Sequence, residues 1–483
     1  MAVAGWMVFA LMRYSHLSVD NDGPSHILGK NIWAIRQQQP TTKKPKMTEK
    51  EETNWMECFG EKGIVEIVGG NTTLTRGAFG DISLALQTVR MEDASNDDDD
   101  QPPDMQEGSK NNENGTSNGL SHHQQKFERK RLRLVSIKTI HLAFTSTKSV
   151  SNNQTLVHLT PAVQSEILAL RSLPSHHNIT RLHAMFVSKQ PATRAICLAF
   201  DYCPADLHLA MEWRRRTFRP LLSFEVLRTI TRDILAALHH CHAHGILHGD
   251  FKPGNLLVSN EGHIQLCDFG LARSFSNNQG HDVNQEHMAK IPEALCTLYY
   301  RPPEVLLGSL ATDPAVDMYS AGTVLAELVL GRPLFMGRND LDQLSVIFSA
   351  LGTPSEDNWP GAMNLPDYGK INFSEQPRQP MSRIVPRAVE SESLVELLDA
   401  LLQPDPQRRL SSYQATQHAW LSQSNSKAQF VSPSLLLLEL VPNELREPVF
   451  LSPPAETPDN FSVAQRQTVA LATTRRSFFS NLK

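Results

Sequence analysis

Acidic, basic and amide side chains crowd into two short stretches near the middle of this chain. The first reads His-Gly-Asp-Phe-Lys-Pro-Gly-Asn over residues 248–255, and the second is Asp268-Phe269-Gly270. Transfer of a phosphoryl group needs little covalent help, but it needs the reactants to be positioned and the phosphate charge to be neutralised. Carboxylate and amide oxygens also bind magnesium. The spacing puts these side chains on two adjacent loops that face one cleft, an arrangement that suits phosphoryl transfer.

The two stretches resemble the catalytic loop and the metal-binding loop of protein kinases. The resemblance implies that Asp250 accepts or orients the proton of a substrate hydroxyl and that Lys252 lies against the transferring phosphoryl group. It also implies that Asn255 and Asp268 hold the Mg²⁺ ions that bridge the phosphates of ATP. The tripeptide at residue 268 carries little weight alone, because such tripeptides also mark ordinary turns after strands.

Further motifs follow the order that the family requires. Residues 135–138, Val-Ser-Ile-Lys, resemble the strand that carries the lysine for the ATP phosphates, with Ser136 where alanine is usual. Glu166 falls where a helix presents the carboxylate partner of Lys138. Without the other motifs, a solvated strand lysine and a solvated helix charge would be the preferred interpretations of these two residues.

Residues 74–82, Leu-Thr-Arg-Gly-Ala-Phe-Gly-Asp-Ile, resemble the glycine-rich loop that covers the phosphates, except that Thr75 replaces the first glycine. Glycine lets backbone N–H groups approach phosphate closely, so the replacement predicts weakened or reshaped ATP binding. A plain hairpin turn is the alternative interpretation. The residues of this region expected to bind ATP are Leu74, Gly77, Gly80 and Ile82.

Residues 198–203, Leu-Ala-Phe-Asp-Tyr-Cys, resemble the hinge that joins the two lobes of a kinase. By that resemblance Phe200 guards the back pocket, while Asp201 and Cys203 offer backbone groups to adenine. The full set of further expected nucleotide-binding residues is Ser136, Lys138, Glu166, Phe200, Asp201, Cys203, Asp206 and Leu257.

Several stretches narrow the resemblance to the cyclin-dependent kinase type. Residues 333–344 and 351–354 resemble the large lobe of that type, and residues 359–373 are most similar to its branch called cell-cycle-related kinase. The resemblance covers about residues 64–421. It implies an α+β fold in which a small lobe of twisted antiparallel sheet with one main helix sits on a larger, mainly helical lobe, with ATP between them.

The resemblance also sets the expected domain boundaries. Residues 1–61 form a mostly disordered extension, 62–202 the small lobe, 203–421 the large lobe and 422–483 a tail. An insertion at about 88–125 is acidic and rich in Asn, Gly and Ser, which is typical of disorder. It is either tolerated low-complexity sequence or an acidic docking segment. The apolar tail residues 433–440 either pack on the large lobe or seat a partner.

Residues 297–304, Thr-Leu-Tyr-Tyr-Arg-Pro-Pro-Glu, look like the end of an activation segment. Glu304 then needs a buried partner, and Arg409 stands where the family places it. Asp317 resembles the buried aspartate that steadies the catalytic loop, with Tyr319 in place of the usual tryptophan. We expect structural rather than catalytic roles for these residues.

The control elements depart from the family pattern. In cyclin-dependent kinases an activation-segment phosphothreonine is held by three arginines. Those positions here hold Gly249, Ser165 and Arg273, and the acceptor position aligns with Pro292. Arginines that cluster without a phosphate only repel one another, so the loss of two of them together with the phosphoacceptor is consistent. It predicts activity that does not depend on activation-segment phosphorylation. A slipped alignment across residues 277–290 is the alternative.

Partners are predicted less directly. Arg301 resembles the arginine that turns a backbone carbonyl away from the substrate and so favours proline, which has no N–H, after the phosphoacceptor. The expected partners are therefore protein substrates with Ser-Pro or Thr-Pro sites. Residues 160–165 are only loosely like a cyclin-contacting helix, which leaves a cyclin-like activating subunit open. The chain's own candidate sites, for which plain loop punctuation is the alternative, are Ser432, Ser452 and Thr457.

A pseudokinase or scaffold is the competing function, and Thr75, Gly249 and Ser165 favour it. An active serine/threonine kinase is preferred, because a chain released from catalysis has no chemical reason to keep the whole catalytic set. Lys252 in the catalytic loop favours the serine/threonine class over the tyrosine class. The retained residues are Lys138, Glu166, Asp250, Lys252, Asn255 and Asp268.

Composition fits an intracellular enzyme in the nucleus, the cytoplasm or both. A net charge of -5 and a pI near 6.4 argue against nucleic acid as the main partner. The six cysteines form no Cys-x-x-Cys pair, which predicts reduced thiols. Cys267 is either a reactive thiol beside ATP or a buried inert one. We expect no membrane span and no signal peptide. Residues 37–53 are polar and lysine-rich and are expected to form a linker, with a nuclear address as the less favoured alternative.

Overall fold

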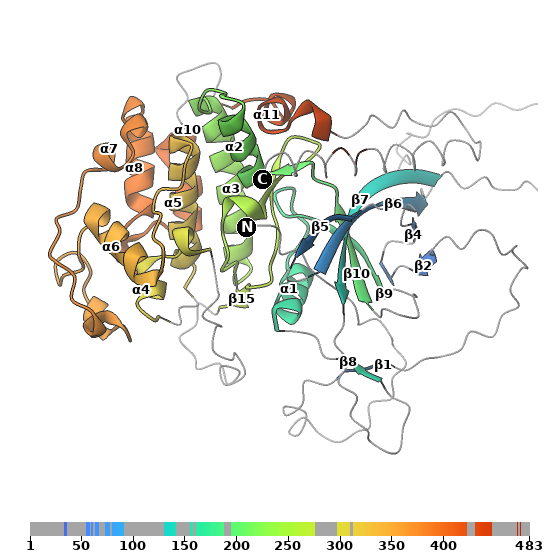
Figure 1. Ribbon diagram of the computed structural model, residues 1–483, viewed down its shortest axis with the longest axis horizontal. Helices are drawn as coiled ribbons and strands as arrows, with labels where there is room; N and C mark the ends of the chain where they lie inside the picture. Colours follow the sequence, from blue (N-terminus) through green and yellow to red (C-terminus); the bar gives the residue numbers. More distant parts are fainter. Residues whose placement is uncertain are drawn as a thin grey trace, which may run out of the picture.

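The computed structural model has the predicted α+β, two-lobe architecture. Figure 1 shows the helices of the large lobe gathered on one side and the sheet of the small lobe on the other, with α1 (Pro161–Ser172) beside the sheet. The structure describes residues 33–35, 55–57, 59–60, 63–66, 73–77, 80–90, 130–141, 155–157, 161–187, 195–275, 297–309, 313–422, 430–446, 471 and 474.

The small lobe is built on an antiparallel sheet whose strand order is β2-β4-β6-β7-β10-β9-β3, with β5 paired to β6. The longest ladder joins β6 and β7, and it runs from Asp81 opposite Thr139 to Arg90 opposite Lys130. The strands are β2 Trp55–Glu57, β3 Phe59–Gly60, β4 Gly63–Glu66, β5 Thr73–Gly77, β6 Gly80–Arg90, β7 Lys130–His141, β9 Leu182–Val187 and β10 Ala195–Asp201.

The short segment 55–60 bonds to both edges of this sheet. Strand β2 pairs with β4 at one edge and β3 pairs with β9 at the other, so the sheet closes on itself. A further small sheet pairs β1 (Trp33–Ile35) with β8 (Thr155–Val157). These pairings place residues 33–35, 55–57 and 59–60 of the expected N-terminal extension in sheet structure, and the rest of that extension lies outside the described residues.

The two faces of the sheet are both buried, and they carry different clusters. Register pairs place Ile82, Lys138 and Leu198 on one face, because cross-strand partners point the same way. Helix α1 packs against this face through Val163 and Ile167. The opposite face holds a separate apolar cluster made of Ala85, Val135, Ile137, Ala184, Phe186, Cys197 and Ala199.

The large lobe is centred on the long helix α3 (Phe224–Ala243), which begins at the N-cap Ser223. Its buried residues, including Val226, Ile230 and Ile234, recur at helical spacing and form the apolar stripe that packs against α5, α9 and β14. The other helices are α2 Leu207–Arg216, α4 Pro303–Leu306, α5 Ala315–Leu330, α6 Asp340–Leu351, α7 Met381–Ile384, α8 Glu392–Leu401, α9 Ser412–Thr416, α10 Ala419–Ser422 and α11 Pro433–Leu440.

Short strands at the junction of the lobes support the predicted catalytic and metal-binding loops. Strands β11, β13 and β14 form one small sheet, and β12 pairs with β15 in another. Their bounds are β11 Ala205–Asp206, β12 Ile246–Leu247, β13 Leu256–Val258, β14 Ile264–Leu266 and β15 Arg273–Ser274.

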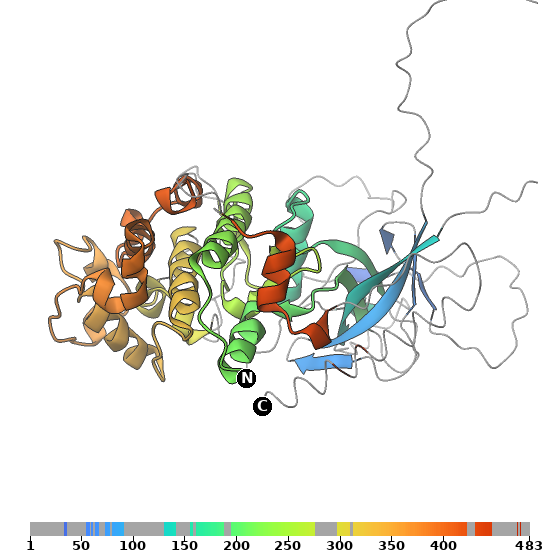
Figure 2. The same cartoon turned by 90° about the horizontal axis from the view of Figure 1, so that it is seen from above.

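The apolar tail residues 433–440 form helix α11 and pack on the large lobe, which is one of the two alternatives drawn from the sequence. Leu436, Leu440, Val441 and Leu445 belong to the large-lobe core, and each is fully buried. Figure 2 shows α11 lying across the junction between the large-lobe helices and the sheet of the small lobe. The domain that packs as one unit therefore includes residues 430–446.

Several predictions fall outside the described residues. They concern the insertion from residue 91 onward, the activation segment around Pro292, the lysine-rich residues 37–53, and the sites Ser452 and Thr457. Strand β6 runs to Arg90, past the expected start of the insertion at residue 88. Within the described residues, no helix combines the length and apolar character needed to cross a membrane.

Candidate active site

Asp250 lies at the centre of a buried polar cluster on the catalytic loop, between β12 and the 3-10 turn η1 (Pro253–Asn255). Lys252 Nζ donates to Asp250 Oδ2 at 2.5 Å. Asn255 Nδ2 donates to the same oxygen at 3.1 Å and to the backbone carbonyl of Asp250 at 2.8 Å. The other carboxylate oxygen, Oδ1, is buried and has no hydrogen-bond partner among the described residues. One oxygen is thus held in place while the other is left for a ligand.

His248 connects this loop to the stretch that precedes Asp268. Its ring is fully buried, and Nδ1 accepts the backbone N–H of Asp250 at 3.3 Å. That contact leaves Nε2 to donate to the carbonyl of Cys267 at 2.9 Å. The ring also packs edge-on against Phe269, with centroids 5.0 Å apart. His248 therefore fixes the spacing of the two loops that carry Asp250 and Asp268.

Asp317, at the start of α5, fixes the backbone of the catalytic loop. Its Oδ2 accepts the backbone N–H of His248 at 2.8 Å, and its Oδ1 accepts that of Gly249 at 2.9 Å. His242 Nε2 donates to Oδ2 at 2.9 Å. Burial alone would raise the pKa of Asp317, but the hydrogen bonds and charges of His242 and His248 outweigh burial and lower that pKa. The buried anchoring role implied by the sequence is observed.

Asp268 follows β14 and has a backbone φ of 63°, an uncommon conformation for any residue except glycine. Burial raises the pKa of its carboxyl group; nearby Lys138 opposes that shift, and Asp250 adds to it. A backbone held in a sparsely populated conformation beside a second carboxylate is typical of a functional site.

Lys138 and Glu166 are both buried, with 1% of each residue exposed, so the solvated interpretations of them are wrong. Burial lowers the pKa of Lys138 to about 8, although Glu166 and Asp268 attract its charge and act in the opposite direction. Lys138 Nζ has no hydrogen-bond partner among the described residues. A buried ammonium group without a hydrogen-bond partner is stabilised when it binds an anion.

The residues present suit magnesium held between protein and phosphate. Within the described part of the chain, no group of three or more His, Cys, Asp and Glu residues forms a metal site. Mg²⁺ commonly takes one or two protein ligands and completes its shell with phosphate oxygens and water. Asn255 and Asp268 match that demand, and both lie near Asp250, whose Oδ1 has no partner within the described part of the chain. They are the residues that would hold the ion.

The hinge supplies the surface expected to face adenine. Cys203, Leu257 and Cys267 form a small buried apolar cluster of their own. It joins Cys203, the second residue after β10, with Leu257 on β13 and Cys267 before Asp268. Burial raises the pKa of the Cys267 thiol well above its usual value, which favours the inert interpretation over the reactive one.

The remaining predicted nucleotide residues are spread over neighbouring elements. Gly77 pairs with Gly80 at the end of the β5–β6 hairpin, whose connecting residues 78 and 79 lie outside the described set. Asp206 caps α2 by accepting the N–H of Leu209 at 2.8 Å. The placements are Leu74 and Gly77 on β5, Gly80 and Ile82 on β6, Ser136 and Lys138 on β7, Glu166 on α1, Phe200 and Asp201 on β10, and Leu257 on β13.

A partly buried polar chain next to the hinge was not predicted from the sequence. Arg133 Nη1 donates to His183 Nδ1 at 2.7 Å, and His183 Nε2 donates to Asp201 Oδ1 at 2.5 Å. These residues come from β7, β9 and β10. The one sign of this arrangement in the sequence is that His183 is a polar residue in the otherwise apolar strand β9. The chain holds the side chain of Asp201 and so fixes the start of the hinge.

Gly249 occupies the position where the family pattern has an arginine. Its φ is 78°, and a Cβ built on it would lie 2.8 Å from the carbonyl oxygen of Leu271. Both observations favour glycine, because other residues rarely adopt that conformation and a side chain would press on the backbone. Arg273, the retained arginine position, lies half-buried on β15, and burial lowers its pKa.

The predicted ion pair between Glu304 and Arg409 is confirmed. Arg409 Nη1 donates to Glu304 Oε1 at 2.6 Å and Nη2 to Oε2 at 2.7 Å, a bidentate contact with both side chains buried. It anchors the end of the activation segment to the large lobe. Beside it, Arg301 Nη1 lies 3.1 Å from Asp340 Oδ1 at the start of α6.

Comparison with known proteins places this architecture in a family. The family model described as protein kinase domain matches residues 124–421. The chain is 36% identical over 255 residues to cyclin-dependent kinase 20 of Rattus norvegicus, covering 53% of this chain and 68% of that protein. It is 38% identical over 266 residues to cyclin-dependent kinase C-1 of Oryza sativa, covering 52% of this chain and 48% of the relative. The chain thus spans about half the length of the rice relatives it matches.

A solved structure gives the same result at the level of fold. A chain of the CAK complex of Chaetomium thermophilum bound to ATP-gamma-S superposes with a TM-score of 0.54 and 26% sequence identity. The match covers 74% of this chain and 93% of that one.

Proposed function

Because this chain belongs to the protein kinase family and, within it, to the cyclin-dependent kinase type, we propose that it transfers the γ-phosphoryl group of ATP to serine and threonine hydroxyls of proteins. The observation that carries the proposal is a pair of buried polar atoms, Asp250 Oδ1 and Lys138 Nζ, that find no hydrogen-bond partner among the described residues and lie on opposite sides of the junction between the lobes. A folded domain leaves such atoms unsatisfied at a cost, so a ligand is expected to complete them.

In the proposed reaction each side chain takes one step. Asp250 Oδ1 accepts the proton of the substrate hydroxyl, while Oδ2 stays bound to Lys252 and Asn255 and keeps the carboxylate oriented. Lys252 neutralises negative charge on the group in transfer. Lys138 binds the phosphates of the nucleotide from the small-lobe side. Mg²⁺, when bound by Asn255 and Asp268, supplies positive charge that offsets the charge of the phosphates.

We propose that the substrates carry proline directly after the phosphoacceptor. Support comes from Arg301, which lies at the end of the activation segment, where the family resemblance implies a preference for proline after the phosphoacceptor. Its guanidinium forms an ion pair with Asp340. The proposed substrates are protein segments with Ser-Pro or Thr-Pro. A proline tolerates a carbonyl that is turned away, because it has no N–H to leave unpaired.

Regulation is proposed to be independent of a phosphothreonine in the activation segment. The backbone at Gly249 supports this, since its conformation and its distance from Leu271 leave no room for the arginine that would grip the phosphate. A cyclin-like activating subunit is retained as a candidate partner, in keeping with the cyclin-dependent kinases to which the chain is similar.

The test is radiolabelled phosphate transfer from Mg-ATP by the purified full chain to three peptides that differ only at the acceptor pair. They carry Ser-Pro, Ser-Ala and Tyr-Pro. The expected order is strong labelling of Ser-Pro, weaker labelling of Ser-Ala and none of Tyr-Pro. Equal labelling of the first two would contradict proline direction. Binding of Mg-ATP without labelling of any peptide, with or without an added cyclin, would favour the scaffold function instead.

A further inference from the structure

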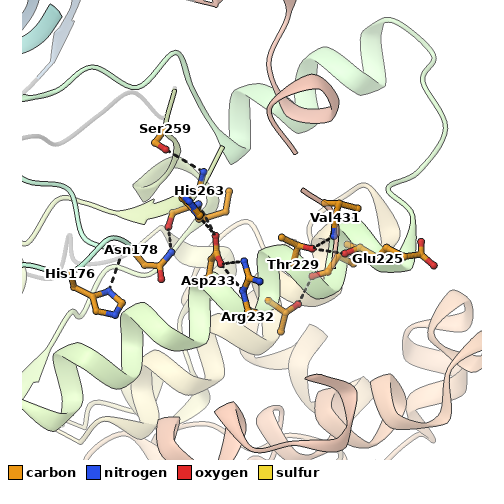
Figure 3. A network of polar contacts seen from close by, with 12 residues as sticks. His176, Asn178, Glu225, Thr229, Arg232, Asp233, Ser259, His263 and Val431 are labelled. Carbon is orange, nitrogen blue, oxygen red and sulfur yellow. Dashed lines mark hydrogen bonds and ion pairs between the residues drawn. The ribbon is translucent and has the colours of Figure 1, made fainter. Parts of the chain in front are cut away.

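The segment 430–446 runs across the large lobe and ends at the hinge. It lies outside the stretch matched by the family model, which ends at residue 421. Its first contact is with α3. Figure 3 shows Val431, whose backbone N–H donates to Thr229 Oγ1 at 3.0 Å, beside a second polar cluster around Asp233 on the same helix. The ring of Phe430 lies 4.7 Å from the guanidinium of Arg232.

Helix α11 is seated in close contact with the turn between β13 and β14. Gly262 in that turn has a φ of 78°, and a Cβ built on it would lie 1.9 Å from the carbonyl oxygen of Pro433. A side chain at residue 262 is therefore incompatible with the seated helix. The backbone of the turn and the first turn of α11 touch directly, which only glycine permits.

A buried arginine fixes the other end of α11 to α2. Arg214 has 5% of its surface exposed and donates to Glu439 Oε2 and to the carbonyl of the same residue, each at 2.7 Å. The same guanidinium also donates to the carbonyl of Pro220 at 2.7 Å. Because a buried guanidinium is costly to leave unpaired, Arg214 makes detachment of α11 unfavourable.

The segment then reaches the hinge itself. Tyr202 is a hinge residue with 3% of its surface exposed, and its hydroxyl donates to the backbone carbonyl of Leu445 at 3.2 Å. Its own carbonyl accepts Asn260 Nδ2 from the β13–β14 turn, also at 3.2 Å. Tyr202 lies between Asp201 and Cys203, the residues expected to face adenine. The segment and the turn it packs on thus hold the middle of the hinge at two points.

We propose that residues 430–446 form a positioning part of the nucleotide site, acting through Tyr202 on the hinge. The inference rests on the proposed function, in that the hinge is taken to bind adenine. A hinge held in its binding geometry before the nucleotide arrives avoids the entropy cost of ordering it on binding. Release of the segment therefore weakens ATP affinity, and it raises KM for ATP more than it lowers kcat.

The test compares full-length Tyr202→Phe and Gly262→Ala with a matched control. Tyr202→Phe removes only the hydroxyl that bonds to Leu445. Gly262→Ala displaces Pro433. Gly361→Ala is the control, because Gly361 has a similar φ of 84° but only one neighbour within 4 Å of a built Cβ, at 3.7 Å. The measurements are hydrogen exchange of residues 198–206 without nucleotide, and KM for ATP and kcat.

Loss of one hydrogen bond of ordinary strength corresponds to roughly a fivefold effect, so Tyr202→Phe is expected to raise KM for ATP about fivefold and to speed hinge exchange. Gly262→Ala is expected to act in the same sense and more strongly, and Gly361→Ala to match wild type. Hinge exchange equal to wild type in both variants would overturn the inference. A wild-type chain that binds no Mg-ATP would instead refute the proposed function, while the exchange data would still decide whether the segment orders the hinge.

Discussion

Two buried clusters of charge in this protein are built in opposite ways. Around Arg409, donors of the guanidinium meet acceptors: Glu304 takes two hydrogen bonds, and the carbonyls of Gln403, Pro404 and Ala315 accept at 2.7 to 3.1 Å. At the junction of the lobes, Lys138 Nζ and Asp250 Oδ1 are just as deeply buried, yet neither has a hydrogen-bond partner among the described residues.

This contrast distinguishes the cluster that stabilises the fold from the cluster that binds a ligand. A buried charge stabilises a fold only when its hydrogen bonds are complete. Arg409 meets this condition, and the ring of Tyr319 lies 4.9 Å from its guanidinium as well. The cluster between the lobes does not meet this condition. Burial lowers the pKa of Lys138 and raises the pKa of Asp268, and both shifts favour the uncharged form of the side chain. Shifted titrating groups in one cluster are typical of an active site.

The largest effect is expected when the cluster around Arg409 is broken. We call this cluster saturated, because every donor of its guanidinium has an acceptor. Glu304→Gln keeps the shape of the side chain but leaves Arg409 charged and buried without its counterion. We expect a loss of about 3–5 kcal/mol of folding free energy, measured by denaturant unfolding. The control is Arg338→Gln, which breaks an exposed ion pair with Asp342 and is expected to change nothing measurable. Equal effects of the two variants would contradict the comparison.

The second variant changes the unsaturated cluster, the one at the junction of the lobes that contains Lys138 and Asp250. Lys138→Met removes the ammonium that is proposed to bind phosphate, and we expect phosphate transfer to fall by about 10²–10³-fold. Because Lys138 Nζ makes no hydrogen bond to the described residues, the midpoint of thermal unfolding without nucleotide should change far less than it does in Glu304→Gln. Addition of Mg-ATP should raise that midpoint in wild type and not in the variant. A large loss of stability with transfer preserved would reverse the assignments.

A pH profile sharpens the role of Lys138. Its pKa of about 8 in the free protein means that the ammonium is charged below that pH and loses its proton above it. We therefore expect kcat/KM for ATP to fall as the pH rises past about 8, approaching a tenfold loss per pH unit. The same lowered pKa makes folding stability rise with pH between about 8 and 10.5, because the unfolded chain then binds more protons. A flat kcat/KM up to pH 10 would contradict the shift.

The smallest effect concerns an exception within the saturated cluster. The hydroxyl of Tyr319 is buried and has no hydrogen-bond partner in the described part of the chain, and burial raises its pKa. Tyr319→Phe removes that hydroxyl and keeps the ring beside Arg409. The expected change in unfolding free energy is within about 0.5 kcal/mol of zero or slightly stabilising. A loss of several kcal/mol would show that the hydroxyl is bonded after all.

The sequence predicts the parts of the molecule that depend on short-range order. Asp250, Lys252 and Asn255 stand within one loop, and their contacts follow from their spacing. Glu304 and Arg409 were paired across the chain only because the family resemblance joins them. The two-lobe fold followed from the same resemblance.

The contacts that sequence reasoning missed join distant segments without a motif. Tyr202 and Leu445 are 243 residues apart, and Leu445 takes part through its carbonyl, a group that every residue has. The chain through Arg133, His183 and Asp201 depends on the register of three strands, which their sequences do not specify. Closure of the sheet by residues 55–60 depends on the positions of both its edges.

The role proposed for Asp250 is tested most directly by measuring two quantities on one variant, Asp250→Asn. This change keeps the size of the side chain but removes the carboxylate whose Oδ1 is proposed to accept the substrate proton. Mg-ATP affinity is measured by calorimetric titration and phosphate transfer by single-turnover labelling of a Ser-Pro peptide. We expect near wild-type affinity and transfer slowed by about 10²–10⁴-fold. Transfer at the wild-type rate would contradict that role, because the atom left without a partner would then have no part in the chemistry.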